Sequence, residues 1–269
     1  MTQPTDDQVF AALSDSGFLF EQQVAAYLEG QDFTVRVSAS YVDPDEQKPR
    51  EIDVLALRNS AHRTSTGDPV TAGVVIECKS NSAPHVTFER GWQDHERKFA
   101  PYQVALGAPG PLPSRTAAGY PTPWDGFGLA DPWNEQRLDR IARGSQVLKI
   151  LRDGGKFGAK SVVHEMAMPA IKATHAFRED WKQDRNTIWF PACITGGKLL
   201  VARPDITSSS DLSQVPFACV GIESRARWLR YENSPRVYFD VVPFDSLGSY
   251  VDHVMTVTDA LAARLTART

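Results

Sequence analysis

VVIECK, residues Val74–Lys79, is the stretch around which the rest of the chain is organised. Its apolar, mostly β-branched beginning predicts a short buried strand. Because side chains alternate along a strand, Glu77 and Lys79 are expected on one face together with Val75. Burying a carboxylate and an ammonium is costly unless each has a partner or a metal ion. An isolated Glu-x-Lys is more often a charged strand end that reaches solvent, so its meaning depends on its neighbours.

Length and composition limit the classes of function. With 269 residues and 42% hydrophobic content, the chain can bury the core of one large domain. Its net charge of -4 gives no global positive field, so any nucleic-acid-binding surface must be local. Cys78, Cys193 and Cys219 lie far apart without a CxxC motif, which predicts reduced core residues. We find no signal-peptide pattern and no bilayer-spanning segment, and expect a soluble cytoplasmic protein with no membrane partner.

The first regular element before VVIECK is a predicted helix over residues 17–30, with N-cap candidates in Ser14–Ser16 and a C-cap at Gly30. One stripe of this helix consists of Glu21, Val24, Ala25 and Leu28. Glu21 would then lie on or beside the buried face. The alternative centres the stripe nearer Phe20 and leaves Glu21 at a solvated edge, and the helix pattern alone favours this alternative.

Two strands are predicted between this helix and VVIECK. Residues 33–38 alternate apolar and polar side chains, and residues 50–57 form a second strand that carries Asp53. Glu51 shares the face of Asp53 and is a secondary candidate. A polar loop over residues 59–69 leads into VVIECK. The chain thus places one acid on a helix, one on the second strand, and Glu-x-Lys on the third.

Folding that gathers these charges would create a specific chemistry. Two neighbouring carboxylates, Asp53 and Glu77, repel each other unless a divalent cation neutralises them. Mg²⁺ prefers oxygen ligands, and the backbone carbonyl of Cys78 offers a third donor. Lys79 could orient or activate a water and stabilise charge on an attacked phosphate, while Glu21 completes the metal shell directly or through water. The set suits metal-assisted phosphodiester hydrolysis, and the chain has neither a GxSxG motif nor a GxxxxGK[ST] phosphate loop.

The remainder of the chain predicts an insertion and an extension. Residues 82–133 are rich in proline and aromatic residues, with one short helix near residues 86–98; the aromatics could stack on bases or, more commonly, pin the loop down. Helices are expected over 134–152 and 161–184 and strands over 186–194, 217–222 and 236–242. Gly196-Gly197 predicts a hairpin turn into residues 198–203, and a terminal helix covers residues 246–268.

A local basic block interrupts this acidic chain. Between residues 137 and 160, seven basic residues face two acidic ones, a net charge of +5. The block indicates either a phosphate-contacting surface or an ordinary solvated helix face. Its members are Arg137, Arg140, Arg143, Lys149, Arg152, Lys156 and Lys160. A second basic-aromatic cluster of lower weight contains Arg225, Arg227, Trp228 and Arg230.

The helix acid, REIDVLAL (residues 50–57) and VVIECKS (residues 74–80) together resemble the PD-(D/E)xK phosphodiesterase superfamily, which includes restriction enzymes and Mrr-like nucleases. The proline of the family motif is replaced by Ile52, a variable position. The resemblance implies a restriction-endonuclease-like α/β core of αβββαβ order, with a mixed central sheet flanked by helices. We therefore expect one domain over residues 1–269, with its core over about 17–80 and 134–195, the insertion over 82–133 and a C-terminal hairpin and helix extension over 196–269.

The resemblance also implies functional roles. Asp53 and Glu77 would be metal ligands, Lys79 the catalytic lysine and Glu21 the auxiliary helix acid. The expected function is Mg²⁺-dependent endonucleolytic cleavage of DNA, with Mn²⁺ as a substitute, in restriction, phage defence or repair. The alternatives are a catalytically silent nucleic-acid-binding or assembly module of the same fold, and an RNA-cleaving nuclease. Double-strand cutting would need two sites, which favours a homodimer.

Overall fold

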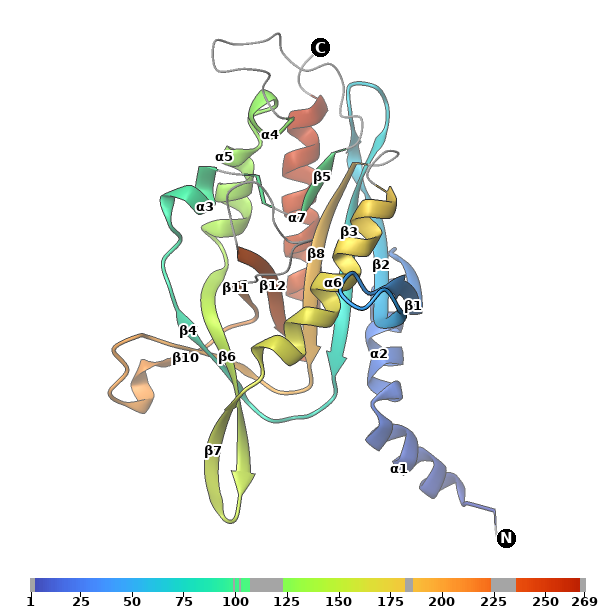
Figure 1. Ribbon diagram of the computed structural model, residues 1–269, viewed down its shortest axis with the longest axis vertical. Helices are drawn as coiled ribbons and strands as arrows, with labels where there is room; N and C mark the ends of the chain where they lie inside the picture. Colours follow the sequence, from blue (N-terminus) through green and yellow to red (C-terminus); the bar gives the residue numbers. More distant parts are fainter. Residues whose placement is uncertain are drawn as a thin grey trace.

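The chain forms an α/β fold with one large mixed sheet flanked by helices (Figure 1). The computed structural model describes residues 3–98, 100–101, 103–106, 123–181, 186–223 and 236–266. The strands follow the order β1-β2-β3-β8-β12-β11-β6-β4-β9-β10, with β5 paired to β8 and β7 paired to β6. Across the described part of the chain, every helix is too short or too polar to cross a membrane.

Two helices precede the sheet. Helix α1 (Asp6–Ser16) begins with a capping box between Thr5 and Gln8, and none of its residues is buried. Gly17, with φ of 83°, separates it from α2 (Phe18–Glu29), which ends at Gly30. The predicted helix 17–30 is therefore confirmed, but the predicted N-cap at Ser14–Ser16 is wrong. Those residues complete the preceding helix, and Gly17 adopts the left-handed conformation between the two without the steric cost that a side chain would add.

The next four principal elements build the part of the sheet that carries VVIECK. Strands β1 (Thr34–Val42), β2 (Pro49–Arg63) and β3 (Pro69–Lys79) are antiparallel neighbours. After a long excursion and helix α6 (Val163–Trp181), strand β8 (Asn186–Thr195) pairs in parallel with β3. All ten residues of β8 are buried, as expected for a central strand covered on both faces. The predicted loop 59–69 is mostly strand, because β2 and β3 continue to a short turn.

Helices cover both faces of this sheet. Val54 and Ile76 pack in a cluster with residues of α2 and of the terminal helix α7 (Leu247–Thr266). Leu55 and Val75 belong to a different cluster, which includes Phe177 of α6. Alternate residues of β2 and β3 therefore enter the two cores, which explains the nearly continuous apolar sequence of VVIECK.

The insertion joins the sheet as well. It contains β4 (His85–Glu89), α3 (Asp94–Lys98), β5 (Val104–Leu106), α4 (Pro123–Gly126) and α5 (Ala130–Trp133). The predicted helix over 86–98 is wrong in its first half, where β4 pairs with β6 and β9. Trp124, Phe127 and Trp133 are buried in the same core as α7, so these aromatics stabilise the fold and are not exposed for stacking. Two other aromatic residues of the insertion, Tyr102 and Tyr120, lie outside the described residues.

The second half of the chain departs most from prediction. The expected helix over 134–152 is a short π-helical turn, η1 (Asn134–Leu138), followed by strand β6 (Ala142–Asp153), which forms a hairpin with β7 (Lys156–Ser161). Gly154-Gly155 is the turn of that hairpin, with φ of 52° and 89°. The predicted hairpin at Gly196-Gly197 is also wrong, because β9 (Leu199–Ala202) pairs with β4 and β10 rather than with β8.

The remaining predicted elements agree with the structure. Strands β11 (Ala218–Glu223) and β12 (Arg236–Pro243) pair with each other, and β12 also runs parallel to β8. A short helical turn, η4 (Phe244–Ser246), leads into α7. Between β9 and β11 lie the turn η2 (Ser209–Asp211) and the edge strand β10 (Leu212–Gln214).

Candidate active site

The structure brings Asp53, Glu77 and Lys79 together at one end of the β2–β3 pair. Val54 pairs with Ile76, so Asp53 and Glu77 are the next residues outward on the two strands. Asp53 Oδ2 accepts a hydrogen bond from the backbone N–H of Cys78 at 2.6 Å. Lys79 Nζ donates to Glu77 Oε1 at 2.8 Å, and both of these side chains are largely buried. The expectation that Glu77 and Lys79 share a face of the strand agrees with this direct ion pair.

The alternation of β2 breaks at Asp53. Ile52 packs in the cluster that includes α6, whereas Val54 packs in the cluster that includes α7, although residues two apart in a regular strand share a face. The register places Ser38 of β1 opposite Asp53, and Ser38 has φ of 49°, which is unusual for a non-glycine residue. Irregular backbone of this kind is frequent at functional sites, where it directs a side chain that a regular strand would turn elsewhere.

Burial disfavours ionisation of both carboxyl groups, and the charge of Asp53 adds to this effect at Glu77. Burial raises the pKa of Asp53, although the Cys78 N–H and the charge of Lys79 oppose the rise. Burial and then the charge of Asp53 raise the pKa of Glu77, against the stabilising ion pair with Lys79. For Lys79, burial favours the neutral amine, but the hydrogen bond and charge of Glu77 outweigh it and raise the pKa. The site therefore combines two carboxyl groups whose pKa values are raised with a lysine whose charged form is stabilised.

Glu21 approaches the pair from α2. Its side chain is half-exposed and lies on the helix beside the buried Val24 and Ala25. Partial burial and then the charges of Asp53 and Glu77 raise the pKa of Glu21. The carboxylates of Asp53 and Glu77 thus disfavour the ionised form of Glu21. Glu51, the secondary candidate, is exposed.

Two further residues at the site were missed by the sequence reading. The charge of Glu165, in the first turn of α6, is among the contributions that raise the pKa of Glu77, after burial and Asp53. Burial, followed by several charges that include Glu77, raises the pKa of Tyr41 to about 12. The start of α6 was itself predictable from sequence, but nothing local indicates that it lies across the sheet from VVIECK.

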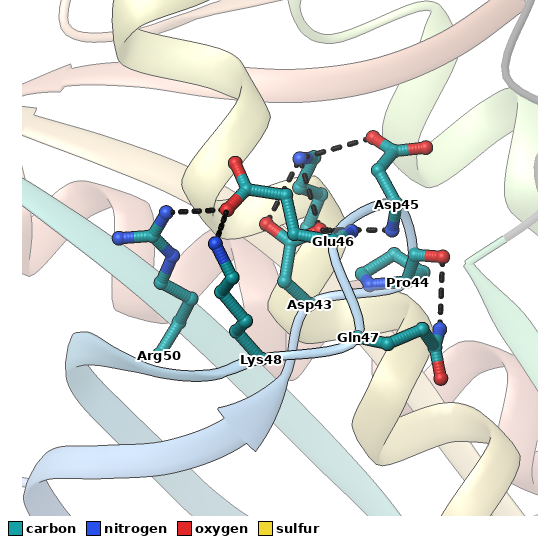
Figure 2. Close-up of polar contacts among 8 residues, drawn as sticks. Asp43, Pro44, Asp45, Glu46, Gln47, Lys48 and Arg50 are labelled. Atoms are coloured by element: carbon teal, nitrogen blue, oxygen red, sulfur yellow. Dashed lines mark hydrogen bonds and ion pairs between the residues drawn. The ribbon is translucent and has the colours of Figure 1, made fainter.

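The turn between β1 and β2, close to this site, is held by a network of charges (Figure 2). Asp43 accepts hydrogen bonds from the backbone N–H groups of Asp45 and Glu46 at 2.8 and 3.1 Å. Lys172 of α6 reaches the carboxylates of Asp43 and Asp45 at 2.9 and 3.0 Å. This clamp ties the end of the β1–β2 hairpin to the helix that covers the sheet.

Oxygen donors suited to Mg²⁺ are present. Asp53 and Glu77 supply two carboxylates, and the pairing of β2 with β3 ends before Cys78, whose N–H faces Asp53. The carbonyl of a strand residue points to the same edge as its N–H, so the Cys78 carbonyl is directed to this side. Within the described ranges, no three His, Cys, Asp or Glu side chains are grouped closely enough to form a metal site by themselves. The oxygen donors at this end of β3 are therefore the two carboxylates and the Cys78 carbonyl, the kind of ligand that Mg²⁺ prefers.

The predicted basic block divides into two parts. Arg137 is buried and paired with Asp240 at 2.8 Å, and Arg143 is buried and paired with Glu96 at 2.6 Å. These two guanidiniums serve the core and are not available to phosphates. Arg140 is exposed, and the block's other members lie on the β6–β7 hairpin: Lys149, Arg152, Lys156 and Lys160. The cluster of Arg225, Arg227, Trp228 and Arg230 lies outside the described residues.

Comparison of the sequence and structure with protein-family models, curated proteins and solved structures finds no match. The function is therefore inferred from the arrangement of the site.

Proposed function

We propose that this protein is a Mg²⁺-dependent endonuclease that hydrolyses phosphodiester bonds in DNA. The observation that carries the proposal is the juxtaposition of Asp53, Glu77 and the Glu77–Lys79 ion pair at one end of β2 and β3. When the elements between β3 and α6 are set aside, the order α2-β1-β2-β3-α6-β8, with β8 parallel to β3, supports a restriction-endonuclease-like core. Burial raises the pKa values of both carboxyl groups, and the charge of Asp53 raises that of Glu77 further; such destabilising arrangements are concentrated at functional sites.

The chain's own residues would perform distinct tasks. Asp53, Glu77 and the Cys78 carbonyl would hold the metal, with Glu21 contributing through a water. The bound Mg²⁺ would neutralise the carboxylates and polarise the phosphate. The ammonium of Lys79 has three N–H donors, and the bond to Glu77 uses one. The others are free to donate to a phosphate oxygen, stabilising the charge that develops as the phosphodiester is attacked.

Plasmid cleavage tests the proposal directly. The purified protein with Mg²⁺ or Mn²⁺ should nick or cut plasmid DNA, and Lys79→Ala and Asp53→Ala should each lower the rate by about 10²–10³-fold or more. Arg63→Ala, a change at an exposed arginine that ends β2 ten residues beyond Asp53, is the control and should retain full activity. Activity that survives both site substitutions rejects the assignment.

Calorimetry with Mn²⁺ separates the nuclease from a catalytically silent module of the same fold. The nuclease should bind Mn²⁺ and lose that affinity in Asp53→Ala and Glu77→Ala. Absence of metal affinity in the wild type, with DNA binding intact, would favour the silent module. Labelled RNA in the same cleavage assay tests the ribonuclease alternative.

A further inference from the structure

The β6–β7 hairpin projects from the body of the protein (Figure 1). Every residue of β7 is exposed, as is β6 from Leu151 onward, and Phe157 is 77% exposed. Gly154 and Gly155 form its two-residue turn with positive φ values, the pattern of a tight hairpin that twists with its strands. The outer hairpin contributes little to the core, so its composition is free to reflect a binding role.

Its charge is strongly positive. Between residues 148 and 161, the four basic residues Lys149, Arg152, Lys156 and Lys160 face the single acid Asp153, a net charge of +3 in a chain of net charge -4. Within the described ranges these four cations form no ion pair, whereas Arg137 and Arg143, slightly earlier in the chain, are both paired and buried. The hairpin therefore presents a net positive charge to solvent through Arg152, Lys156 and Lys160, with Lys149 half-buried at its base and Asp153 opposite Lys156.

Two of the cations are placed directly opposite each other. Lys149 pairs in register with Lys160 on β7, and on its other side with His85 on β4. Burial and then the positive charge of Lys149 lower the pKa of His85 to about 4. Like charges on directly opposed strand residues are destabilising, and an anion between them would relieve the repulsion.

We infer that the β6–β7 hairpin is an arm that binds the phosphate backbone of duplex DNA. The outer part of the hairpin, six residues in each strand, extends about 20 Å at roughly 3.3 Å per residue. A two-stranded ribbon fits the major groove, which is about 12 Å wide. The C-terminal end of β3, which carries Glu77 and Lys79, points to the same end of the molecule as the hairpin (Figure 1). One duplex could therefore contact both.

Phe157 adds an apolar contact to this arm. It lies directly opposite Arg152. Because residues three apart in a strand point to opposite faces, this pair lies on the other face of the ribbon from Lys149 and Lys160. The two faces therefore offer different kinds of contact. An exposed aromatic can pack on sugars or bases, while the lysines neutralise phosphates. The identification of DNA as the ligand rests on the proposed nuclease function, but binding by the arm does not require cleavage.

The test is the equilibrium binding of a short labelled DNA duplex in EDTA, measured by fluorescence anisotropy over a series of salt concentrations. The slope of log K against log salt is negative, and each lost phosphate contact reduces its magnitude by about 0.9, so Lys149→Gln/Lys160→Gln should reduce the magnitude by about 1.8. If the wild type and the double variant bind equally at about 1 M salt, this difference in slope predicts that the variant binds about 60-fold more weakly at about 0.1 M salt. Arg63→Gln/Arg264→Gln removes two exposed charges at the opposite end of the molecule and should leave the slope unchanged.

Separate outcomes distinguish this inference from the nuclease proposal. Phe157→Ala should weaken binding without changing the salt slope. If duplex binding depends on the hairpin but the protein never cleaves, the nuclease proposal fails and the arm stands. Equal affinity and slope for wild type and the double lysine variant overturn the arm, as does hairpin-dependent binding to phosphatidylserine vesicles without duplex binding. If circular dichroism shows that the double variant does not fold, Lys156→Gln, a single change beside the turn, should reduce the magnitude of the slope of log K against log salt by about 0.9.

Discussion

Replacing Arg137 with methionine should destabilise the protein severely, although Arg137 belongs to the basic block that the sequence associates with nucleic acid. The Arg137 and Asp240 side chains are 1% and 0% exposed, and Arg137 Nη2 lies 2.8 and 2.9 Å from the two Asp240 carboxylate oxygens. The guanidinium also lies 5.2 Å from the ring centres of both Trp133 and Phe190. Burial opposes the charge, but Asp240 outweighs it and raises the pKa of Arg137.

The magnitude follows from what the substitution leaves behind. Without Arg137, the buried Asp240 carboxylate retains a hydrogen bond from the Tyr250 hydroxyl at 2.9 Å but loses its cation. Removing one partner of a buried pair costs about 3–5 kcal/mol. A domain is stable by only about 5–15 kcal/mol, so the free energy of unfolding should fall by a large fraction. In Arg137→Met/Asp240→Asn no unpaired charge remains, and Tyr250 keeps an acceptor, so much of the loss should be recovered.

Urea denaturation followed by tryptophan fluorescence measures these differences. The transition midpoint of Arg137→Met should fall while the slope of the free energy against urea stays constant. Arg140→Met, on the exposed side of the same region, should change stability by less than about 0.5 kcal/mol. A loss below about 1 kcal/mol for Arg137→Met, or a double variant no more stable than the single one, would refute the argument from uncompensated buried charge.

Three further predictions concern other parts of the fold. Asp53→Asn should stabilise the protein by about 1 kcal/mol at neutral pH while abolishing cleavage. Because the folded-state pKa of Asp53 is raised, the wild type loses stability as the pH rises from the unfolded-state pKa through the folded-state pKa. Calorimetry should therefore show the stability difference between variant and wild type vanish below about pH 4, where Asp53 is protonated in both states. Gly144→Ala would place a Cβ 1.9 Å from Thr87 Oγ1 and should cost about 1–3 kcal/mol in urea denaturation, whereas Gly158→Ala meets no atom within 4 Å and should not. Lys172→Met removes the cation that clamps the β1–β2 turn to α6 and should cost about 1–3 kcal/mol, again by urea denaturation.

The first third of the fold was predictable because its signals are local. VVIECK combines β-branched residues with two buried faces, and the neighbouring strands are joined to it by short turns. Antiparallel strands close in sequence pair with each other, so order predicts that the strands of Asp53 and Glu77 are neighbours, whereas the register that places the two residues at the same end of the strand pair comes from the structure. The break at Ser38 could not be predicted, since no glycine or proline marks it.

The region of β6 shows why local patterns fail elsewhere. Leu138, Ile141 and Val147 are compatible with a helical stripe, and Gly154-Gly155 is equally a helix stop and a hairpin turn. The pairing of β6 with β4 and β11, which come from distant parts of the chain, decides in favour of a strand. Propensity is a weak preference that such tertiary contacts override.

Charge counting fails for a related reason. The sequence contains the cations Arg137 and Arg143 but does not reveal their partners, which are separated from them by 103 and 47 residues respectively. Only the arrangement of the sheet separates these buried, paired guanidiniums from the exposed cations of the hairpin. A basic block is therefore a set of candidates, and burial decides which of them can meet a phosphate.

The balance of charge in the interior supports the proposed metal. At three places a largely buried cation meets a carboxylate directly: Arg137 with Asp240, Arg143 with Glu96, and Lys172 with Asp43. At the end of β3 the pattern differs, because Glu21, Asp53 and Glu77 face the single ammonium of Lys79. When these four groups are ionised, their excess is two negative charges, which one divalent cation neutralises, and the charge of Glu165 at the start of α6 adds to the excess. Folding alone does not require this imbalance, so we expect Mg²⁺ or Mn²⁺ to raise the melting temperature of the wild type and to have little effect on Asp53→Asn/Glu77→Gln.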